Sequence, residues 1–233
     1  MPQLSHFKSA PPEAVRMQIV QLAGMNATEL SLTNIRPDNQ LFPLYRLMLG
    51  IEVATYLNCM GAPDSLPTEV LVAFDDANPL MVVGFLLYMP LDGRSDAAGV
   101  LYMAVENAFR GRGIGSDLVE GLLDRRPDVG LSCFPDKVGF YEALGFEVVG
   151  VHATQIKMST RRDHSGGQMR TLDQNEIARA PAVRKLAASL VQSAGQAGYD
   201  AAEDALVSDV ERLCIQARAT YQAKQSRVPK PAV

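Results

Sequence analysis

A glycine-rich turn between a strand-like run and a helical run limits what this 233-residue chain can fold into more than any other feature. The turn is Arg110-Gly111-Arg112-Gly113-Ile114-Gly115; the apolar run 99–105 precedes it and the amphipathic run 116–125 follows it. A junction of this kind directs free backbone N–H groups and the positive end of a helix dipole at one point. The sequence therefore predicts a phosphate or pyrophosphate site, which the glycines leave open to close approach.

Three known motifs contain a turn of this composition. A P-loop would end in Gly-Lys-Ser/Thr, whereas this chain has Ile114-Gly115-Ser116. A Rossmann fingerprint fits Gly111 and Gly113, but it belongs directly after the first strand of a nucleotide domain, and at least two strand-like runs come earlier here. The third pattern, [Gln/Arg]-x-x-Gly-x-[Gly/Ala], is satisfied from Arg110 to Gly115. It resembles the acyl-CoA signature of the GNAT superfamily of N-acetyltransferases.

A second segment carries the same resemblance. The run 140–146, Phe-Tyr-Glu-Ala-Leu-Gly-Phe, follows a short strand candidate at 129–133 and looks like the Phe-Tyr-x-x-x-Gly-Phe segment of that family. The two motifs occur in the family's order and at a typical separation. The resemblance covers about residues 66–158, is weak over 1–65 and is absent after about 165.

The resemblance implies acetyl-CoA as the acyl donor and an amine as the acceptor. Backbone N–H groups of the glycine turn would hold the pyrophosphate, with the two arginines adding positive charge, and the end of the 99–105 strand would lie beside the pantetheine arm. An N–H near Val105 would polarise the thioester carbonyl. The residues expected to bind the donor are Met103, Val105, Arg110, Gly111, Arg112, Gly113, Ile114, Gly115, Ser116 and Phe140.

Two residues are candidates for proton transfer. In the family, the tyrosine of the second motif faces the sulfur of coenzyme A, which makes Tyr141 the candidate general acid; a phenol is protonated at neutral pH and can donate to a leaving thiolate. The alternative is that Tyr141 only packs. Glu106, just past the central strand, is the nearest candidate general base. The alternatives are that Glu106 is a solvated turn residue, and that water relays the proton or no dedicated base exists.

Composition excludes several other classes of protein. The net charge of −4 argues against a general nucleic-acid binder. The three cysteines are far apart in the sequence and form no disulfide framework, so we expect a reducing, cytoplasmic environment. The longest apolar run, 80–89, is too short to span a bilayer. The three histidines are isolated, so we expect no metal site.

Hydrophobic periodicity predicts an α/β fold with a mixed sheet and a helical C-terminal extension. The resemblance implies that the sheet has a GNAT-like arrangement. The expected strands are 3–8, 68–74, 81–89, 98–105, 129–133, 146–150 and 154–158, and the expected helices are 12–23, 42–57, 116–125 and the segment that carries the Phe-Tyr pair. Asp136 is the expected N-cap of that last helix, and Gly145 its left-handed C-terminal residue.

The chain divides, on this interpretation, into an acetyltransferase domain over 1–160, a linker over 161–170, a helical extension over 171–223 and a disordered tail over 224–233. The extension contains two helical runs, 182–194 and 200–223, and the second has one stripe of small and aliphatic residues. An exposed stripe of this length would favour association. We therefore expect it to be buried, either on the sheet or in a homodimer.

The resemblance favours an N-acetyltransferase that moves an acetyl group from acetyl-CoA to a primary amine by direct attack in a ternary complex. Two alternatives remain open at this point. One is a module that binds acyl-CoA without turning it over, since no obvious base is present. The other is an enzyme that acetylates a protein lysine or N-terminus.

Overall fold

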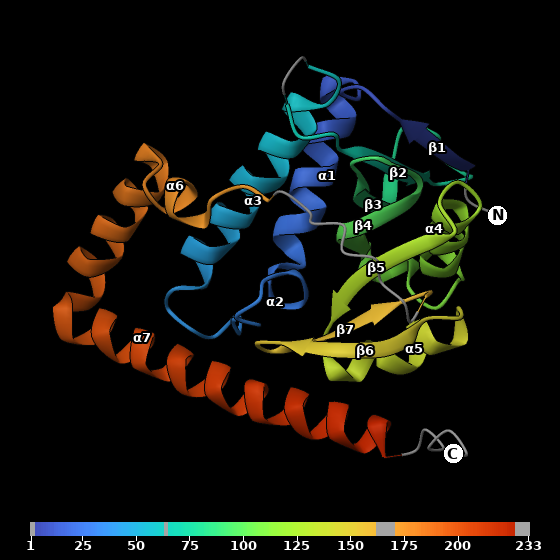
Figure 1. Cartoon of the computed structure of the whole chain (residues 1–233). Coiled ribbons are helices and arrows are strands. Elements are labelled where there is room, and N and C mark those ends of the chain that lie inside the picture. Colours follow the sequence, from blue (N-terminus) through green and yellow to red (C-terminus); the bar gives the residue numbers. More distant parts are fainter. Residues whose placement is uncertain (1–2, 63–64, 162–170, 227–233) are drawn as a thin grey trace.

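The computed structural model describes residues 3–62, 65–161 and 171–226 of the chain. Its centre is one seven-stranded mixed sheet with the strand order β1-β2-β3-β4-β5-β7-β6 (Figure 1). The strands are Gln3–Phe7 (β1), Glu69–Phe74 (β2), Val82–Leu91 (β3), Arg94–Val105 (β4), Asp128–Cys133 (β5), Glu147–His152 (β6) and Gln155–Ser159 (β7). The predicted fold class, a mixed sheet with helices and a helical extension, is confirmed.

Helices cover both faces of this sheet. On one face lie α1 (Glu13–Met25) and α3 (Phe42–Cys59), which form a core with β2 and β3. On the other face, α4 (Ile114–Leu123) and α5 (Val138–Ala143) pack on the central and last strands. A short helix, α2 (Ala27–Leu30), follows α1 in the connection to α3. None of the helices in the described ranges combines the length and apolar character needed to cross a bilayer.

The antiparallel meander of β2, β3 and β4 follows the predicted pattern, with one difference. Strand β4 begins at Arg94, earlier than the expected start at 98, because the hairpin pairing with β3 continues to Leu91 and Arg94. Strand β3 is buried along nearly its whole length, as its continuous apolar sequence predicts for a central strand. The register between β3 and β4 shifts between Leu87 and Tyr88, which leaves Leu101 as an extra residue in β4.

Strands β4 and β5 are parallel and pair only at one end. The register runs from Ala97 opposite Asp128 to Gly99 opposite Gly130, and beyond it residues 100–105 have no strand partner on the β5 side among the described residues. Two strands that part in this way leave unpaired backbone groups facing an opening in the middle of the sheet. Strands β4 and β5 are therefore splayed beyond Gly99.

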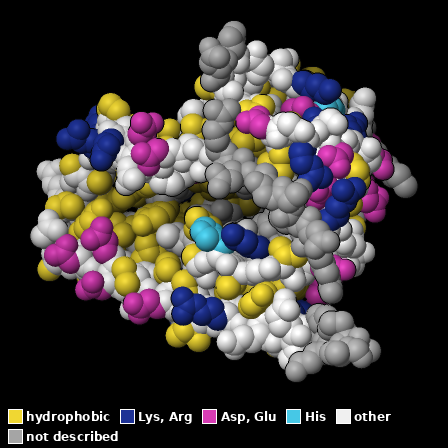
Figure 2. All heavy atoms as spheres, in the orientation of Figure 1, with side chains coloured by type: hydrophobic (Ala, Val, Ile, Leu, Met, Phe, Trp, Pro, Cys, Tyr) yellow, Lys and Arg dark blue, Asp and Glu magenta, His cyan; other side chains and the backbone are white. Residues whose placement is uncertain are grey.

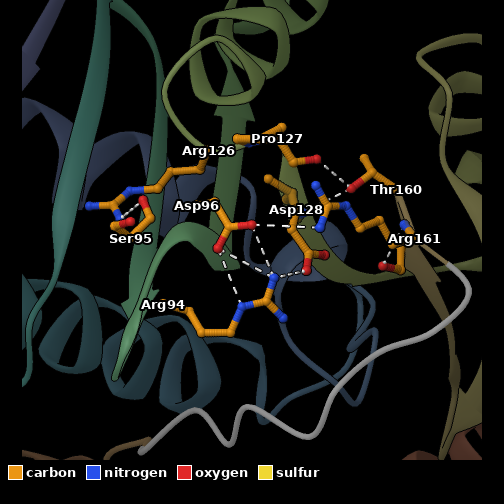
Figure 3. A network of polar contacts seen from close by, with 10 residues as sticks. Arg94, Ser95, Asp96, Arg126, Pro127, Asp128, Thr160 and Arg161 are labelled. Atoms are coloured by element: carbon orange, nitrogen blue, oxygen red, sulfur yellow. Dashed lines mark hydrogen bonds and ion pairs between the residues drawn. The ribbon is translucent and has the colours of Figure 1, made fainter.

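A network of polar contacts closes the paired end of these two strands (Figure 3). The Arg94 guanidinium donates to the carboxylates of Asp128, at 2.7 Å, and Asp96, at 3.1 Å. Arg161, just past β7, forms an ion pair with Asp96 at 3.6 Å. Since Asp128 is only 2% exposed, Arg94 neutralises a buried negative charge. The network holds β4 and β5 together beside the point where they begin to part.

The C-terminal extension wraps around the domain. Helix α6 (Gln174–Ala178) leads into α7 (Pro181–Gln225), which changes direction sharply at Gly195, where φ is 71° and ψ is 162° (Figure 1). The two helical runs predicted from the sequence correspond to the two arms of α7. Its second arm packs on β6 and β7, and Ala217 is fully buried in the same core as α4 and α5.

The boundaries of the extension differ slightly from those expected. Helix α7 ends at Gln225, two residues past the expected end at 223. The predicted linker falls on 162–170 and the predicted tail on 227–233, apart from their first residues, and those segments lie outside the described residues. The division of the chain into a domain and an extension thus stays a prediction.

Candidate active site

The glycine turn forms the N-terminus of α4, as the sequence predicts. Gly113 is the N-cap residue and has a φ of 87°, a left-handed conformation in which a side chain would be strained. The first intrahelical bond runs from Asp117 N–H to the Gly113 carbonyl. Within the described residues, the N–H groups of residues 111–116 donate to no backbone carbonyl. A run of free donors at the start of a ten-residue helix is suited to an anion.

The arginine side chains of the turn are already engaged. Arg110 donates to the Glu29 carboxylate at 2.8 Å, to the Asn26 side-chain oxygen and to the Val105 carbonyl at 3.2 Å. The Arg110 guanidinium thus links α2, through Glu29, to the end of β4, through the Val105 carbonyl. Arg112 lies over the Phe109 ring, 4.8 Å from the centroid. The predicted contact of these arginines with phosphate stays a prediction.

A cavity of about 1150 Å³ extends from the glycine turn through the opening between β4 and β5. It brings together nearly all the residues that the sequence analysis singled out for donor binding, and also Tyr141. Those that line it are Met103, Val105, Arg110, Gly111, Gly113, Ile114, Gly115, Ser116, Phe140 and Tyr141. Arg112 and Glu106 are not among its lining residues.

Tyr141 lies at the centre of an aromatic cluster on α5. Its ring meets the rings of Phe140 and Phe146 edge to face, with centroids 4.9 Å and 5.7 Å away. The side chain is only 8% exposed, and burial, with a smaller contribution from Cys133, raises the pKa of its phenol above the usual value. The phenol is therefore protonated at neutral pH. The Phe140 ring also packs on α4 at Gly115. A Cβ at that position would lie only 3.4 Å from the ring.

The positions of two side chains, Glu106 and Asp136, differ from those expected for a general base and a helix N-cap. Glu106 lies past the end of β4, where its N–H donates to the Val83 carbonyl at 2.9 Å, and it is not among the residues that line the cavity. Its role as a base stays untested. Asp136 is not the N-cap of α5, because residues 135–137 form a separate turn of 3-10 helix and no side chain caps α5. Gly145 does adopt the predicted left-handed conformation, with a φ of 87°.

A buried carboxylate, which the sequence analysis did not single out, lines the opposite end of the same cavity. Glu52 on α3 is 6% exposed and accepts a hydrogen bond from Gln174 at 2.8 Å and another from the Tyr102 hydroxyl. Burial raises its pKa, and these two hydrogen bonds oppose the rise. The available signal was a glutamate between Ile51 and Val53, on the mainly apolar helix predicted at 42–57.

The histidines and cysteines of the described residues are the side chains to consider as metal ligands or as a nucleophile. In the described ranges, no three His, Cys, Asp or Glu side chains are grouped as they would be around a metal ion. Cys133 lines the cavity, but burial raises the pKa of its thiol to about 12, so it is a thiol rather than a thiolate at neutral pH. His164 lies outside the described residues.

Comparison with known proteins finds a family match for the central part of the chain. Residues 67–148 match the acetyltransferase (GNAT) domain. PaiA N-acetyltransferase from Thermoplasma acidophilum, solved in complex with coenzyme A, superposes with a TM-score of 0.50 at 15% identity, over 68% of this chain and 99% of that one. None of the curated proteins compared with the chain matches its sequence.

Two further solved structures are similar. An aminoglycoside 6'-acetyltransferase type Ii has 20% identity and a TM-score of 0.48, over 67% of this chain and 95% of its own. A Corynebacterium glutamicum protein, described as histone acetyltransferase HPA2 and related acetyltransferase, has 16% identity and a TM-score of 0.49, over 73% of this chain and 99% of its own. Residues 67–148 thus correspond to a GNAT acetyltransferase domain, and they include the glycine turn at α4 and the splayed β4–β5 pair.

Proposed function

We propose that the protein transfers an acetyl group from acetyl-CoA to a primary amine, by direct attack in a ternary complex. One observation carries the proposal. A single cavity joins the free N–H groups of the glycine turn, the protonated Tyr141 and, beyond the opening in the sheet, a buried carboxylate. Donor and acceptor can thus approach each other from the two sides of the sheet.

The donor half of the cavity offers what a coenzyme A thioester requires. The N–H groups of residues 111–116 donate to no backbone carbonyl of the described residues and would be available to a pyrophosphate, and the unpaired edge of β4 from Val100 to Val105 can hydrogen-bond the pantetheine amides as a neighbouring strand would. An N–H of that edge near Val105 would polarise the thioester carbonyl, and such a donor is worth about 10²–10³ in rate.

The reaction needs two proton movements. The neutral amine attacks the thioester carbon, the C–N bond forms, and the C–S bond breaks as the tetrahedral intermediate collapses. The leaving sulfur takes the Tyr141 proton, and the phenol is reprotonated from water. The ammonium form of the acceptor loses two protons in all: one balances the proton now on sulfur and the other enters the solvent.

A pair of glycine variants tests the donor site. Gly113 and Gly93 both have positive φ, 87° and 73°, and a Cβ would meet no atom within 4 Å at either position. Each change to alanine should therefore cost about 1 kcal/mol of stability through backbone strain. Only Gly113→Ala places a methyl group in the proposed pyrophosphate site, so calorimetry should show at least a tenfold loss of acetyl-CoA affinity for this variant alone.

The activity is tested by coenzyme A thiol release with acetyl-CoA and a panel of primary amines, amino acids and lysine-containing peptides. Release with a small amine supports the proposal, and release with peptides alone would support a protein acceptor instead. Tight acetyl-CoA binding without release from any acceptor would favour a sensor. Equal acetyl-CoA affinities for the two glycine variants would contradict the assignment of the pyrophosphate site.

A further inference from the structure

The acceptor half of the cavity contains a carboxylate that has no cation beside it. The described residues that line the cavity include two carboxylates, Glu29 and Glu52. Glu29 forms ion pairs with Arg110 at 2.8 Å and Lys137 at 3.5 Å. Glu52 is 6% exposed, and within the described part of the chain it bonds Gln174 and Tyr102 but forms no ion pair. A buried carboxylate is ordinarily paired with a positive charge.

The surroundings of Glu52 are mainly apolar and aromatic. The Tyr102 hydroxyl donates a hydrogen bond to Glu52. Tyr102 precedes Met103 on the unpaired edge of β4, where acetyl-CoA is expected to bind. Figure 2 shows hydrophobic side chains gathered in the hollow between α3 and α7. The apolar and aromatic residues that line this half of the cavity are Leu30, Leu32, Tyr45, Met48, Leu49, Tyr56, Leu101 and Leu172. An occupant of this half would thus present one charged end and an apolar body.

We infer that Glu52 binds the ammonium group of the acceptor and accepts a proton from it, and that the acceptor is a monocationic primary amine with an apolar or aromatic body. This inference rests on the proposed acetyl transfer. A polycation would need a carboxylate for each additional charge, yet Glu29 is already paired. Lys157 also lines the cavity and forms no ion pair with another described residue, so it would repel a further positive charge.

The proton step follows from this contact. An N–H bond of the ammonium breaks, the proton moves to a carboxylate oxygen of Glu52, and the electron pair left on nitrogen attacks the thioester carbon. Water then takes the proton from Glu52 and restores the carboxylate. The raised pKa of Glu52, which follows from its burial, makes the carboxylate a stronger base than an exposed glutamate would be.

The C-terminal extension completes this part of the site. Gln174, at the start of α6, holds the Glu52 carboxylate, and the Leu172 N–H donates to the Tyr56 hydroxyl at 3.1 Å. Both residues lie outside the segment 67–148 that matches the family. Gln174 is therefore a positioning residue, which acts on the acceptor through Glu52, and the extension contributes to acceptor specificity.

Binding experiments test the charge without relying on turnover. 2-Phenylethylamine and 2-phenylethanol have the same body and differ in the cation, so calorimetry on the coenzyme A complex isolates the contribution of the charge. We expect the wild type to bind the amine about 10- to 100-fold more tightly than the alcohol, as a charge-assisted hydrogen bond provides. Glu52→Gln should remove this preference, whereas Glu211→Gln, at an exposed position on α7, should keep it.

The pH profile tests Gln174. The titratable groups that face Glu52 are Tyr102 on β4 and Tyr56 on α3, and both have raised pKa values through burial, so neither ionises in the acid range. The acid limb of kcat/KM for 2-phenylethylamine should thus report Glu52. Because the Gln174 hydrogen bond lowers the pKa of Glu52, Gln174→Leu should move this limb to higher pH. Gln196→Leu, on the exposed surface of α7, should leave it in place.

The outcomes of these experiments distinguish failure of the Glu52 inference from failure of the proposed acetyl transfer. Equal affinity of the wild type for the amine and the alcohol, or an unchanged preference in Glu52→Gln, overturns the inference but leaves the donor site intact. A preference for spermidine over 2-phenylethylamine overturns it as well. Absence of acetyl-CoA binding by the wild type would instead overturn the proposed function.

Discussion

Tyr141 combines tight packing with a position on the wall of the cavity. Its ring is enclosed by Phe140 and Phe146, which fixes the ring, while the side chain still contributes to the cavity wall. Burial raises the pKa of the phenol, so the proton is present at every pH at which the protein would work. A phenol held in this way is suited to donate to a sulfur that gains negative charge.

Tyr141→Phe removes the hydroxyl and almost no volume. If Tyr141 is the general acid, kcat should fall about 10²- to 10⁴-fold while acetyl-CoA affinity stays near the wild-type value. Steady-state kinetics together with calorimetry check both parts. Since no hydrogen bond of the Tyr141 hydroxyl to another described residue is present, stability should change little. An unchanged kcat would mean that the tyrosine only packs and that water protonates the thiolate.

The residues that could be predicted from the sequence are those whose role is set by their neighbours in the chain. The glycine turn and the Phe140-Tyr141 pair depend on local backbone conformation and on short motifs, and both lie on the cavity as expected. Glu52 was missed because its partner Gln174 is 122 residues away, and no local pattern links them. The partners of Arg110 on α2 are likewise more than 80 residues distant.

The bend within α7 depends on a single glycine. At Gly195 φ is 71° and ψ is 162°, a combination that is open essentially to glycine alone. The bend lets the first arm follow α6 while the second runs beneath β6 and β7 (Figure 1). The sequence predicted two helical runs separated by a gap, but the angle between them depends on contacts with distant elements.

Gly195→Ala should therefore loosen the second arm. We expect a cost of about 1–3 kcal/mol, borne by the docking of residues 196–225. Hydrogen exchange would show lower protection in that arm and unchanged protection in β3, which is buried in the centre of the sheet. Equal loss of protection in both elements would show that the arm and the sheet unfold as one unit.

The apolar stripe of the extension packs on its own chain. Leu206 and Ala202 meet Ile35 and Leu41 in a small core between α7 and the loop before α3, and Asn39 donates to the Ala202 carbonyl at 3.0 Å. Ala202 and Leu206 thus pack on a loop rather than on the sheet, whereas Ala217 of the same stripe lies in a core that includes sheet residues. A homodimer is not needed to cover these residues, and the oligomeric state stays a separate question.

Leu206→Ala tests this packing. Leu206 is 5% exposed, so truncation should lower the free energy of unfolding by about 2–3 kcal/mol. The loss should not depend on protein concentration, because the contact lies within one chain. Val207→Ala is the matched control, since Val207 is 57% exposed and its truncation should cost little. Denaturant titrations at two concentrations measure both, and a loss that shrinks at high concentration would indicate a dimer contact.

The far end of α7 reaches the helix that carries the candidate acid. Lys224 donates to the carboxylate of Glu142, directly after Tyr141, at 2.7 Å. The same extension, through Gln174, holds the carboxylate of the acceptor side. One segment of chain thus contacts both the helix of the candidate acid and the carboxylate of the proposed acceptor site. If both sites bind as proposed, the free energy of detaching this segment enters the affinity for either substrate. By thermodynamic linkage, a ligand that binds better when the extension is docked also shifts the extension toward the docked state. The rate of proteolysis of the extension should therefore fall as the occupancy of that ligand rises.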